Sequence, residues 1–444
     1  MPMDAVTWDD ALQSALDSLL NDRLAILIGA GLSMSPPSSL PSAWTIAARA
    51  KSKYDAMYGA TRPPLPDSVD EQAEFFFQRG ELATAYFRTF IDSNAFAGPP
   101  NPGHSAVADL LLVCALKSAV TTNVDVLIET AGQMLLGQIG VGIDGHSVAA
   151  LSANCAPLLK LHGCRHIDPT NMVWARGQLS ASPVSDRIQT STGCLNVRLL
   201  DRDLLIIGYW TDWDYLNDVL ATTLGAVNPV RVIVVDPAES AVFEQKAPAL
   251  YALGQRATTT FRHLRALGSE FLDALRLQFA KSFVRQVLHS GVTAFQDAIG
   301  NAPNDAWKEP GDLTNEMLWK VRRDLEGCAP GQPAQARMPP MEPLLGATLL
   351  RLQAGGATAD GPYWLLNNRR IRVLRAVNKA LHAVEAQYER EDPPAIAPDI
   401  VIAVGADSQA LAPNVARART TATIARGSSV QWMTRSEAMQ TLGL

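Results

Sequence analysis

The chain has 444 residues and a net charge of −6, with 47% hydrophobic and 18% charged residues. These values are typical of a globular protein of two or three domains, and they exclude a global electrostatic attraction to nucleic acid or to an anionic membrane. The five cysteines are scattered and include no C-x2-C pair, which argues against a disulfide framework and against a four-cysteine zinc ribbon.

The N-terminal segment has neither the basic region nor the unbroken apolar run of a secretory signal. No apolar run reaches the roughly 18 residues that a membrane span needs. We therefore expect a cytoplasmic protein without a membrane segment.

Five apolar, β-rich runs occur in the first half of the chain, at 24–29, 118–123, 157–163, 204–209 and 230–236. Several are apolar throughout, as in strands that are buried on both faces of a parallel sheet. Helical patterns such as 70–91 and 214–227 lie between them. This alternation predicts an α/β fold with a doubly wound, mainly parallel sheet.

Residues 40–100 are too many for one crossover connection, and we expect a small helical insertion beside the site. A helical stretch is predicted from about 257 to 290, where the first domain (residues 1–290) ends. Five prolines between 328 and 343 predict a linker within residues 291–345.

Residues 346–444 predict a smaller α/β module for assembly or partner binding. Apolar residues at helical spacing predict a helix over 369–386, and runs at 399–407 and 429–433 predict strands. The predicted helix carries a concentrated group of basic residues, namely Arg369, Arg370, Arg372, Arg375 and Lys379.

Glycines and polar residues follow the ends of the predicted strands. In a doubly wound sheet the ligand lies beyond the carboxyl ends of the strands, so these residues are predicted to share one crevice. Glycines there let backbone N–H groups approach a phosphate, and a hydroxyl adds a donor. The candidate site residues are Gly29, Ala30, Gly31, Ser33, Thr122, Asn123, Asp125, His162, Gly208 and Asp236.

Each motif also has a purely structural interpretation. The glycine turn needs no ligand, Asn123 and Asp125 can cap the next helix, and Asp236 can do the same. A single histidine such as His162 is often structural rather than a general base.

The order of the motifs is more informative than any one of them. GAG-x-S, T-T-N-x-D, K-L-H-G, a strand that ends in glycine and a strand that ends in Asp resemble the sirtuin family, whose members bind NAD. The segment PNPGHSAVADLL at 101–112 also resembles the sirtuin segment that precedes the T-x-N-x-D motif. The resemblance covers about residues 15–260 and implies a Rossmann-like sirtuin core.

The resemblance implies a role for each candidate residue. Asn123 would position a water or the nicotinamide-side ribose with support from Asp125, and His162 would be the general base. The NAD-binding residues would be Gly29, Ala30, Gly31 and Ser33 at the pyrophosphate, Thr122 beside Asn123, and Gly208 and Asp236 near the adenosine half.

Two departures point away from a deacylase. The zinc ribbon that follows the H-G motif in protein-deacylating sirtuins is missing, and SPPSSLPSAW stands where those enzymes carry G-I-P-D-F-R. The chain thus resembles zinc-free bacterial sirtuin-like NAD hydrolases of antiphage defence, although Tyr209 is followed by Trp210 where those proteins have a G-Y-S motif.

We therefore expect an NAD hydrolase that uses NAD as its substrate, needs no zinc and releases nicotinamide and ADP-ribose. The resemblance implies a homo-oligomer and a partner such as a HerA-like ATPase or a prokaryotic Argonaute, without sequence-specific nucleic-acid binding. An NAD-dependent protein deacylase or ADP-ribosyltransferase is one alternative, and a non-catalytic NAD or ADP-ribose sensor is another.

Overall fold

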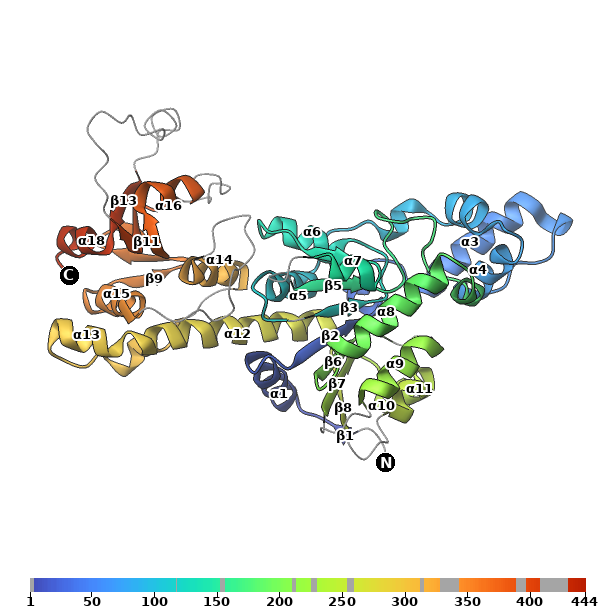
Figure 1. Ribbon diagram of the computed structural model, residues 1–444, viewed down its shortest axis with the longest axis horizontal. Helices are drawn as coiled ribbons and strands as arrows, with labels where there is room; N and C mark the ends of the chain where they lie inside the picture. The colour runs from blue at the N-terminus through green and yellow to red at the C-terminus, as the bar shows by residue number, and fades with distance from the viewer. Residues whose placement is uncertain are drawn as a thin grey trace. The chain divides into compact units, whose positions relative to one another are not determined.

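A computed structural model describes residues 4–116, 118–151, 156–209, 213–224, 230–253, 259–311, 315–327, 343–388, 397–407 and 430–444. The chain divides into two compact units, residues 1–276 and 277–444. Figure 1 shows the elements of both units in chain order.

The first unit is built on an eight-stranded sheet in the order β1-β8-β7-β6-β2-β3-β5-β4, and every neighbouring pair is parallel. The strands are β1 (Asp4–Ala5), β2 (Leu24–Ile28), β3 (Ala119–Thr121), β4 (Gly140–Gly142), β5 (Pro157–Lys160), β6 (Asp203–Ile207), β7 (Val230–Asp236) and β8 (Thr259–Arg265). The five predicted strands are β2, β3, β5, β6 and β7.

The strand order is that of a doubly wound Rossmann-like sheet. From β2 the chain moves outward to β3 and β5, then returns to β6 on the other side of β2 and continues to β7 and β8. The carboxyl ends of β2 and its neighbours therefore surround the point where the winding direction reverses, which is where such folds bind ligands. The predicted fold class is confirmed.

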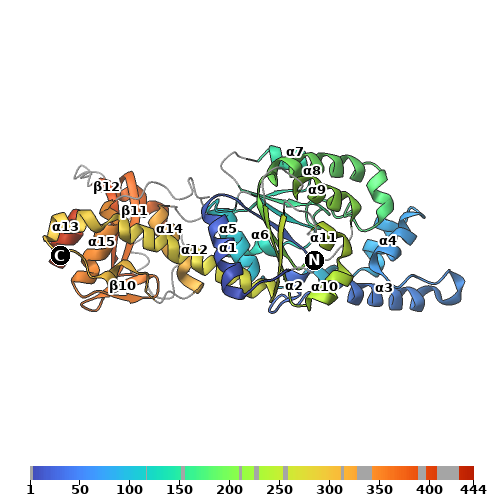
Figure 2. The ribbon, with the colours of Figure 1, turned by 90° about the horizontal axis from the view of Figure 1, so that it is seen from below.

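Helices cover both faces of this sheet, and Figure 2 shows α1 and α5 on one face and α8, α9 and α11 on the other. Apolar side chains from α8, α9, α10 and α11 form one core with the strands. The helices of this unit outside residues 40–100 are α1 (Trp8–Leu20), α2 (Gly31–Met34), α5 (Pro102–Leu112), α6 (Leu127–Met134), α7 (Gly145–Ala149), the short η4 (Arg176–Ser180), α8 (Val184–Arg198), α9 (Asp214–Leu224), α10 (Ser240–Lys246), α11 (Pro248–Leu253) and the first part of α12 (Gly268–Ser290).

Residues 40–100 form the expected helical insertion, which has a core of its own. Tyr54, Phe76, Tyr86 and Phe90 are fully buried there, with the Phe76 and Tyr86 rings stacked at 5.0 Å between centroids. The Tyr86 hydroxyl donates to Gln72 Oε1 at 2.9 Å. The elements are α3 (Ala43–Tyr58), η1 (Gly59–Thr61), α4 (Val69–Phe77), the π-helical η2 (Leu82–Phe90) and η3 (Ser93–Phe96).

The prediction of one helical stretch over 257–290 is wrong in its first part. Residues 259–265 are strand β8, and α12 begins at Gly268. Exposed Thr260 and Arg262 alternate with buried Phe261 and His263, which is the two-residue period of a strand. The strong helical pattern that follows obscures this short period in the sequence.

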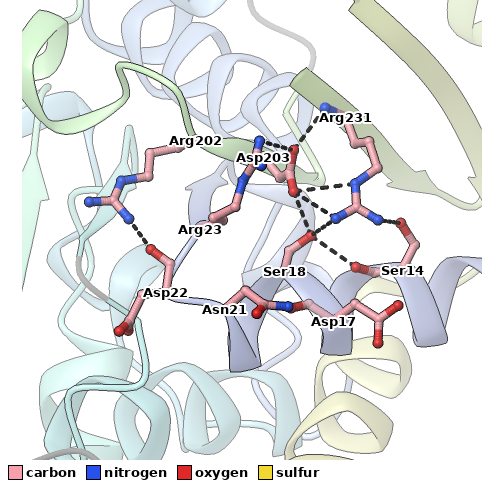
Figure 3. Close-up of polar contacts among 9 residues, drawn as sticks. All are labelled: Ser14, Asp17, Ser18, Asn21, Asp22, Arg23, Arg202, Asp203 and Arg231. Atoms are coloured by element: carbon pink, nitrogen blue, oxygen red, sulfur yellow. Dashed lines mark hydrogen bonds and ion pairs between the residues drawn. The ribbon is translucent and has the colours of Figure 1, made fainter. Parts of the chain in front are cut away.

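A polar network fixes α1 at the amino edge of the sheet, opposite the predicted crevice (Figure 3). The buried Asp203 carboxylate at the start of β6 accepts from Ser18 Oγ of α1 at 2.7 Å and from Arg231 of β7 at 3.0 Å. Burial opposes ionisation of Asp203, but these hydrogen bonds outweigh it and lower its pKa. Arg231 also donates to Ser14 Oγ at 3.2 Å, so a single carboxylate joins α1, β6 and β7.

The second unit contains a five-stranded mixed sheet in the order β13-β12-β11-β10-β9. Strands β9 (Thr358–Asp360), β10 (Tyr363–Leu366) and β11 (Arg369–Ala380) pair antiparallel, and β11, β12 (Ile400–Asp407) and β13 (Gln431–Thr434) pair in parallel. The helices are the remainder of α12, α13 (Val292–Ile299), η5 (Asp305–Lys308), α14 (Asn315–Glu326), α15 (Pro343–Ala354), α16 (Leu381–Tyr388) and α18 (Arg435–Leu442).

The predicted basic helix over 369–386 is wrong, because residues 369–380 form strand β11 and only 381–388 are helical. Ile371 and Val373 belong to one core and Leu374 and Ala376 to another, so the strand is buried on both faces and loses its alternating pattern. Arg372 is buried as well, and its guanidinium forms a two-point ion pair with Asp324 at 2.6 and 2.7 Å.

The two predicted strands of the C-terminal module are confirmed as β12 and β13. The units divide at residue 276, within α12, whereas the predicted first domain runs to the end of that helix at 290. Phe295 of α13 and Leu325 of α14 share a core with the second sheet. Most of the proline-rich stretch, 328–342, lies outside the described residues. No helix in the described ranges is long and apolar enough to cross a membrane.

Candidate active site

A cavity of about 480 Å³ lies beyond the carboxyl ends of β2, β3 and β5, in the first unit. Six predicted site residues line it: Ala30, Ser33, Thr122, Asn123, Asp125 and His162. The opposite wall comes from the helical insertion and from residues 173–176, and it is mainly apolar and aromatic. Such a concave, mostly apolar space with a few converging polar groups is the usual form of a small-molecule site.

Three glycines allow the turns after β2 and β6 to touch. A Cβ on Gly29 would lie 2.5 Å from Gly208 O, and one on Gly31 would lie 2.7 Å from Gly208 Cα. Gly208 itself has a φ of +57°, which disfavours any residue with a side chain. Glycine at these three positions is therefore required by backbone packing.

The amides of this turn have partners within the protein. Gly29 N–H donates to Ile207 O at 2.9 Å, and Gly31 N–H donates to Gly208 O at 3.0 Å. We expected these N–H groups to face a phosphate, but they hold the two strand ends together. Of the first three residues of the motif, Ala30 is the one that lines the cavity.

Ser33 is the centre of a buried hydrogen-bond network. Its Oγ donates to Asp125 Oδ2 at 2.9 Å and lies 3.1 Å from His104 Nε2. His104 Nδ1 accepts from the Asn101 amide at 3.1 Å, which leaves the proton of a neutral ring on Nε2 to be donated to Ser33. Burial lowers the pKa of His104 to about 4, in agreement with this neutral form.

Asn123 joins this network to the cavity. Its Nδ2 donates to Gly29 O and to Ser33 Oγ, both at 3.2 Å, and its backbone N–H donates to Thr121 Oγ1 at 3.0 Å. The amide plane is thus held from two sides while the residue remains half-buried at the cavity wall. This fixed orientation suits a group that positions a water or a sugar hydroxyl.

Asp125 is buried and fully engaged. Besides Ser33, its carboxylate accepts from the Leu127 amide at 3.1 Å, so the helix-capping interpretation of this residue is also correct. Its backbone carbonyl accepts from Lys160 Nζ, and that ammonium group also pairs with Glu129 Oε1 at 2.7 Å. The buried lysine of the K-L-H-G motif therefore ties the loop after β3 to strand β5.

His162 differs from these residues because its Nε2 is buried and has no hydrogen-bond partner among the described residues. The Trp213 ring packs edge-on against the imidazole, with 4.8 Å between centroids. Burial, and next the nearby Arg187 cation, lower the pKa of His162 to about 3. His162 is thus a neutral imidazole at the cavity wall, and no described residue engages its Nε2.

Four predicted site residues lie apart from the cavity lining. Gly29, Gly31 and Gly208 form the backbone contact described above. Asp236 is buried at the end of β7, where its carboxylate accepts from the backbone N–H of Ala238 at 2.8 Å in an Asx-type turn, two residues before α10 begins. Strand β6 separates β7 from β2.

Several residues that complete the site were not predicted from the sequence. His104 and Asn101 lie in the quoted segment 101–112, and the Asn-Pro start of a helix is a signal for the capping box that they form. Trp213 and Arg176 line the cavity from segments with no motif of their own, and Arg176 lies 5.7 Å above the Trp213 ring.

Cys155, His162, Cys164 and His166 lie close together in the sequence, and the structure describes the last three. Cys155 lies outside the described residues, and Cys164 is buried with a free thiol. In the described ranges, no group of three or more His, Cys, Asp and Glu side chains is arranged to hold a metal ion.

No family model and no curated protein matches the chain. Among solved structures, it is similar to a Sir2 homologue in complex with NAD, with 16% identity, 63% of this chain and 96% of the other covered, and a TM-score of 0.36. It is also similar to a Sir2 protein bound to a p53 peptide and NAD+, with 14% identity, 60% and 98% coverage, and a TM-score of 0.34.

Proposed function

We propose that the chain is an NAD hydrolase that cleaves NAD to nicotinamide and ADP-ribose. The observation that carries this proposal is the convergence of two residues on one cavity, at the strand ends where a Rossmann-like sheet binds its ligand. They are Asn123, whose amide is held in a fixed orientation, and His162, whose Nε2 has no hydrogen-bond partner among the described residues. The sequence motifs at the same positions support NAD as that ligand.

The proposed reaction needs only water and NAD. The water oxygen forms a bond to C1′ of the ribose as the bond from C1′ to the nicotinamide nitrogen breaks. The electron pair of the broken bond neutralises the positive ring, and the proton lost by the water passes to a base or to solvent. Stabilisation of the positive charge that develops on the ribose lowers the barrier.

Each residue has a part in this scheme. Asn123 orients the water or a ribose hydroxyl, and the network of Ser33 and Asp125 holds Asn123 in place. His162 is the proposed general base, through an Nε2 that has no hydrogen-bond partner in the described part of the chain. Ala30 and Thr122 lie at the cavity wall beside them, and Gly29, Gly31 and Gly208 shape the turn that would receive the pyrophosphate. We retain Asp236 as an outer contact for the adenosine half.

The test is to incubate the purified full chain with NAD and to follow nicotinamide by chromatography. We expect Asn123→Ala and His162→Ala to lower the rate by at least about a hundredfold, while NAD binding measured by calorimetry persists. Asn304→Ala serves as the matched control, because that asparagine caps η5 in the second unit.

The alternatives give different results in the same assay. A deacylase or ADP-ribosyltransferase would release nicotinamide only when an acylated peptide or an acceptor protein is added. A sensor would bind NAD without turnover. Binding without nicotinamide release under every condition, including addition of partner proteins, would exclude the hydrolase.

We further propose that the hydrolase depletes NAD in bacterial antiphage defence and is held inactive until it assembles, alone or with a partner such as a HerA-like ATPase or a prokaryotic Argonaute. This scheme involves no sequence-specific contact with nucleic acid, no membrane and no zinc. In it the protein acts in the cytoplasm. The molar mass of the protein in solution, measured with and without NAD, tests whether it forms a homo-oligomer.

A further inference from the structure

Arg187 of α8 lies against the backbone of the residue that follows His162. A Cβ on Gly163 would be 3.3 Å from Arg187 Nη1 and 3.5 Å from Nη2. The Arg187 side chain is only 6% exposed, so its charge is held inside the protein rather than in solvent. No step of the proposed reaction has yet used this cation.

The guanidinium holds together the loop that begins at His162. Arg187 Nη2 donates to Asn171 O at 2.8 Å, and Nη1 lies 3.8 Å from Asp168 Oδ2. The loop then returns to its start, because Val173 N–H donates to His162 O at 2.9 Å. Gly163 has a φ of +85°, which lets the chain turn sharply here.

The charged and titratable groups around His162 come from several elements. Arg187 of α8 and Tyr215 of α9 lie on the protein side, with 6.3 Å between the His162 and Tyr215 rings. Asp125, Asp70 and Arg176 line the cavity. Asp168 and Asp144 interact with Arg187 itself. Among these charged groups, Arg187 disfavours a positive charge on the imidazole. Its effect on the pKa of His162 comes second to that of burial.

We infer that Arg187 is a positioning residue for His162: its guanidinium braces the 163–173 loop, and its buried positive charge opposes a further positive charge nearby. The inference deepens the proposed function, on which it rests for the role of His162. The brace and the charge are separable, because Arg187→Lys keeps the charge but loses the planar fork, whereas Arg187→Met loses both.

The charge is tested in the NAD-free protein. Histidine carbon signals are followed by NMR between pH 8 and 4, and the signal of His162 is assigned by its loss in His162→Gln. We expect the acid titration of His162 to begin about one pH unit higher in Arg187→Met than in the wild type. In Arg187→Lys and in the control Arg198→Met, from the same helix, it should not move.

The brace is tested by turnover and by hydrogen exchange. For Arg187→Lys we expect kcat to fall roughly tenfold with KM for NAD little changed, and the amides of 163–173 to exchange faster. In Arg187→Met the acid limb of the rate should also move up by about one pH unit.

A folded Arg187→Met protein, checked by circular dichroism, whose His162 titrates as in the wild type would overturn the electrostatic part. Wild-type kcat and wild-type exchange in Arg187→Lys would overturn the brace. If Arg187→Met does not fold, Arg187→Gln replaces it in the test of the charge. The Arg187→Lys result tests the brace in either case. The NMR and exchange results do not depend on NAD turnover, so failure of the proposed function would be seen separately.

Discussion

The Ser33 hydroxyl donates to Asp125 Oδ2 at 2.9 Å and so joins the turn after β2 to the loop after β3. The same oxygen accepts from Asn123 Nδ2 and lies within hydrogen-bond distance of His104 Nε2. A hydroxyl has one donor and two acceptor positions, and all three are used here. The two loops are therefore held at a fixed spacing at the floor of the cavity.

Removal of this hydroxyl should affect both stability and activity. Ser33→Ala leaves a buried carboxylate oxygen, an amide and an imidazole N–H with one partner fewer, and we expect it to lower the free energy of unfolding by about 1–3 kcal/mol. NAD turnover should fall at least roughly tenfold because Asn123 loses one of its two anchors. Urea unfolding and nicotinamide release measure the two effects. Ser52→Ala, an exposed position on α3, is the control and should change neither.

The buried His104 makes stability depend on pH. Its pKa is lowered to about 4 in the folded chain, against an ordinary value of 6.5, so below pH 6.5 the unfolded chain binds more protons than the folded one. The stability contributed by the neutral ring is complete above pH 6.5 and is lost as the pH falls toward 4, by about 1.4 kcal/mol per pH unit at most.

Urea midpoints at pH 7.5, 6.0 and 5.0 would show this loss in the wild type. His104→Gln lowers stability at pH 7.5 but should reduce the slope below pH 6.5. Replacement of the exposed His289 by Gln should leave the slope as it is. An unchanged slope in His104→Gln would contradict the burial argument.

Gly208→Ala should destabilise the first unit. The substitution places a Cβ in the left-handed region and 2.7 Å from Gly31 Cα, and both atoms in that clash belong to rigid turns. We expect a loss of at least about 2 kcal/mol, of which strain at positive φ contributes about 1–2. Gly193→Ala is the matched control, because a Cβ there meets nothing within 4 Å in helix α8, and it should stabilise by about 0.5–1 kcal/mol. Thermal melting of both variants compares them directly.

The ion pair between Arg276 and Asp109 should matter far more than a surface pair. Arg276 Nε lies 2.7 Å from Asp109 Oδ2, and both side chains are buried. Arg276→Met takes this guanidinium away from a buried carboxylate, and we expect a loss of about 3–5 kcal/mol. The exposed pair of Arg265 and Glu239 provides the comparison, and Arg265→Met should cost less than about 1 kcal/mol. Denaturant unfolding measures both variants. Equal losses of unfolding free energy would show that burial does not explain the strength of the Arg276–Asp109 pair.

Much of the first unit could be predicted from the sequence. The runs at β2, β3, β5, β6 and β7 are apolar because these strands are buried on both faces. Glycine or polar residues follow them at the carboxyl edge of the sheet, where the cavity lies. Such local patterns also placed Ser33, Asn123, Asp125 and His162 at one cavity.

The tertiary structure decided what the local pattern left open. Residues 369–380 and 259–265 form strands because neighbouring strands pair with them, and no local signal records that pairing. Two sets of contacts depend on which elements pack together. Ser33 contacts His104, which is 71 positions away in the sequence, and Arg187 of α8 binds the loop that follows His162. The sequence by itself determined which residue types stand at the strand ends, since those depend on local geometry and burial. Only the packing of distant elements determined which of their atoms are engaged and which, like His162 Nε2, have no hydrogen-bond partner within the described ranges.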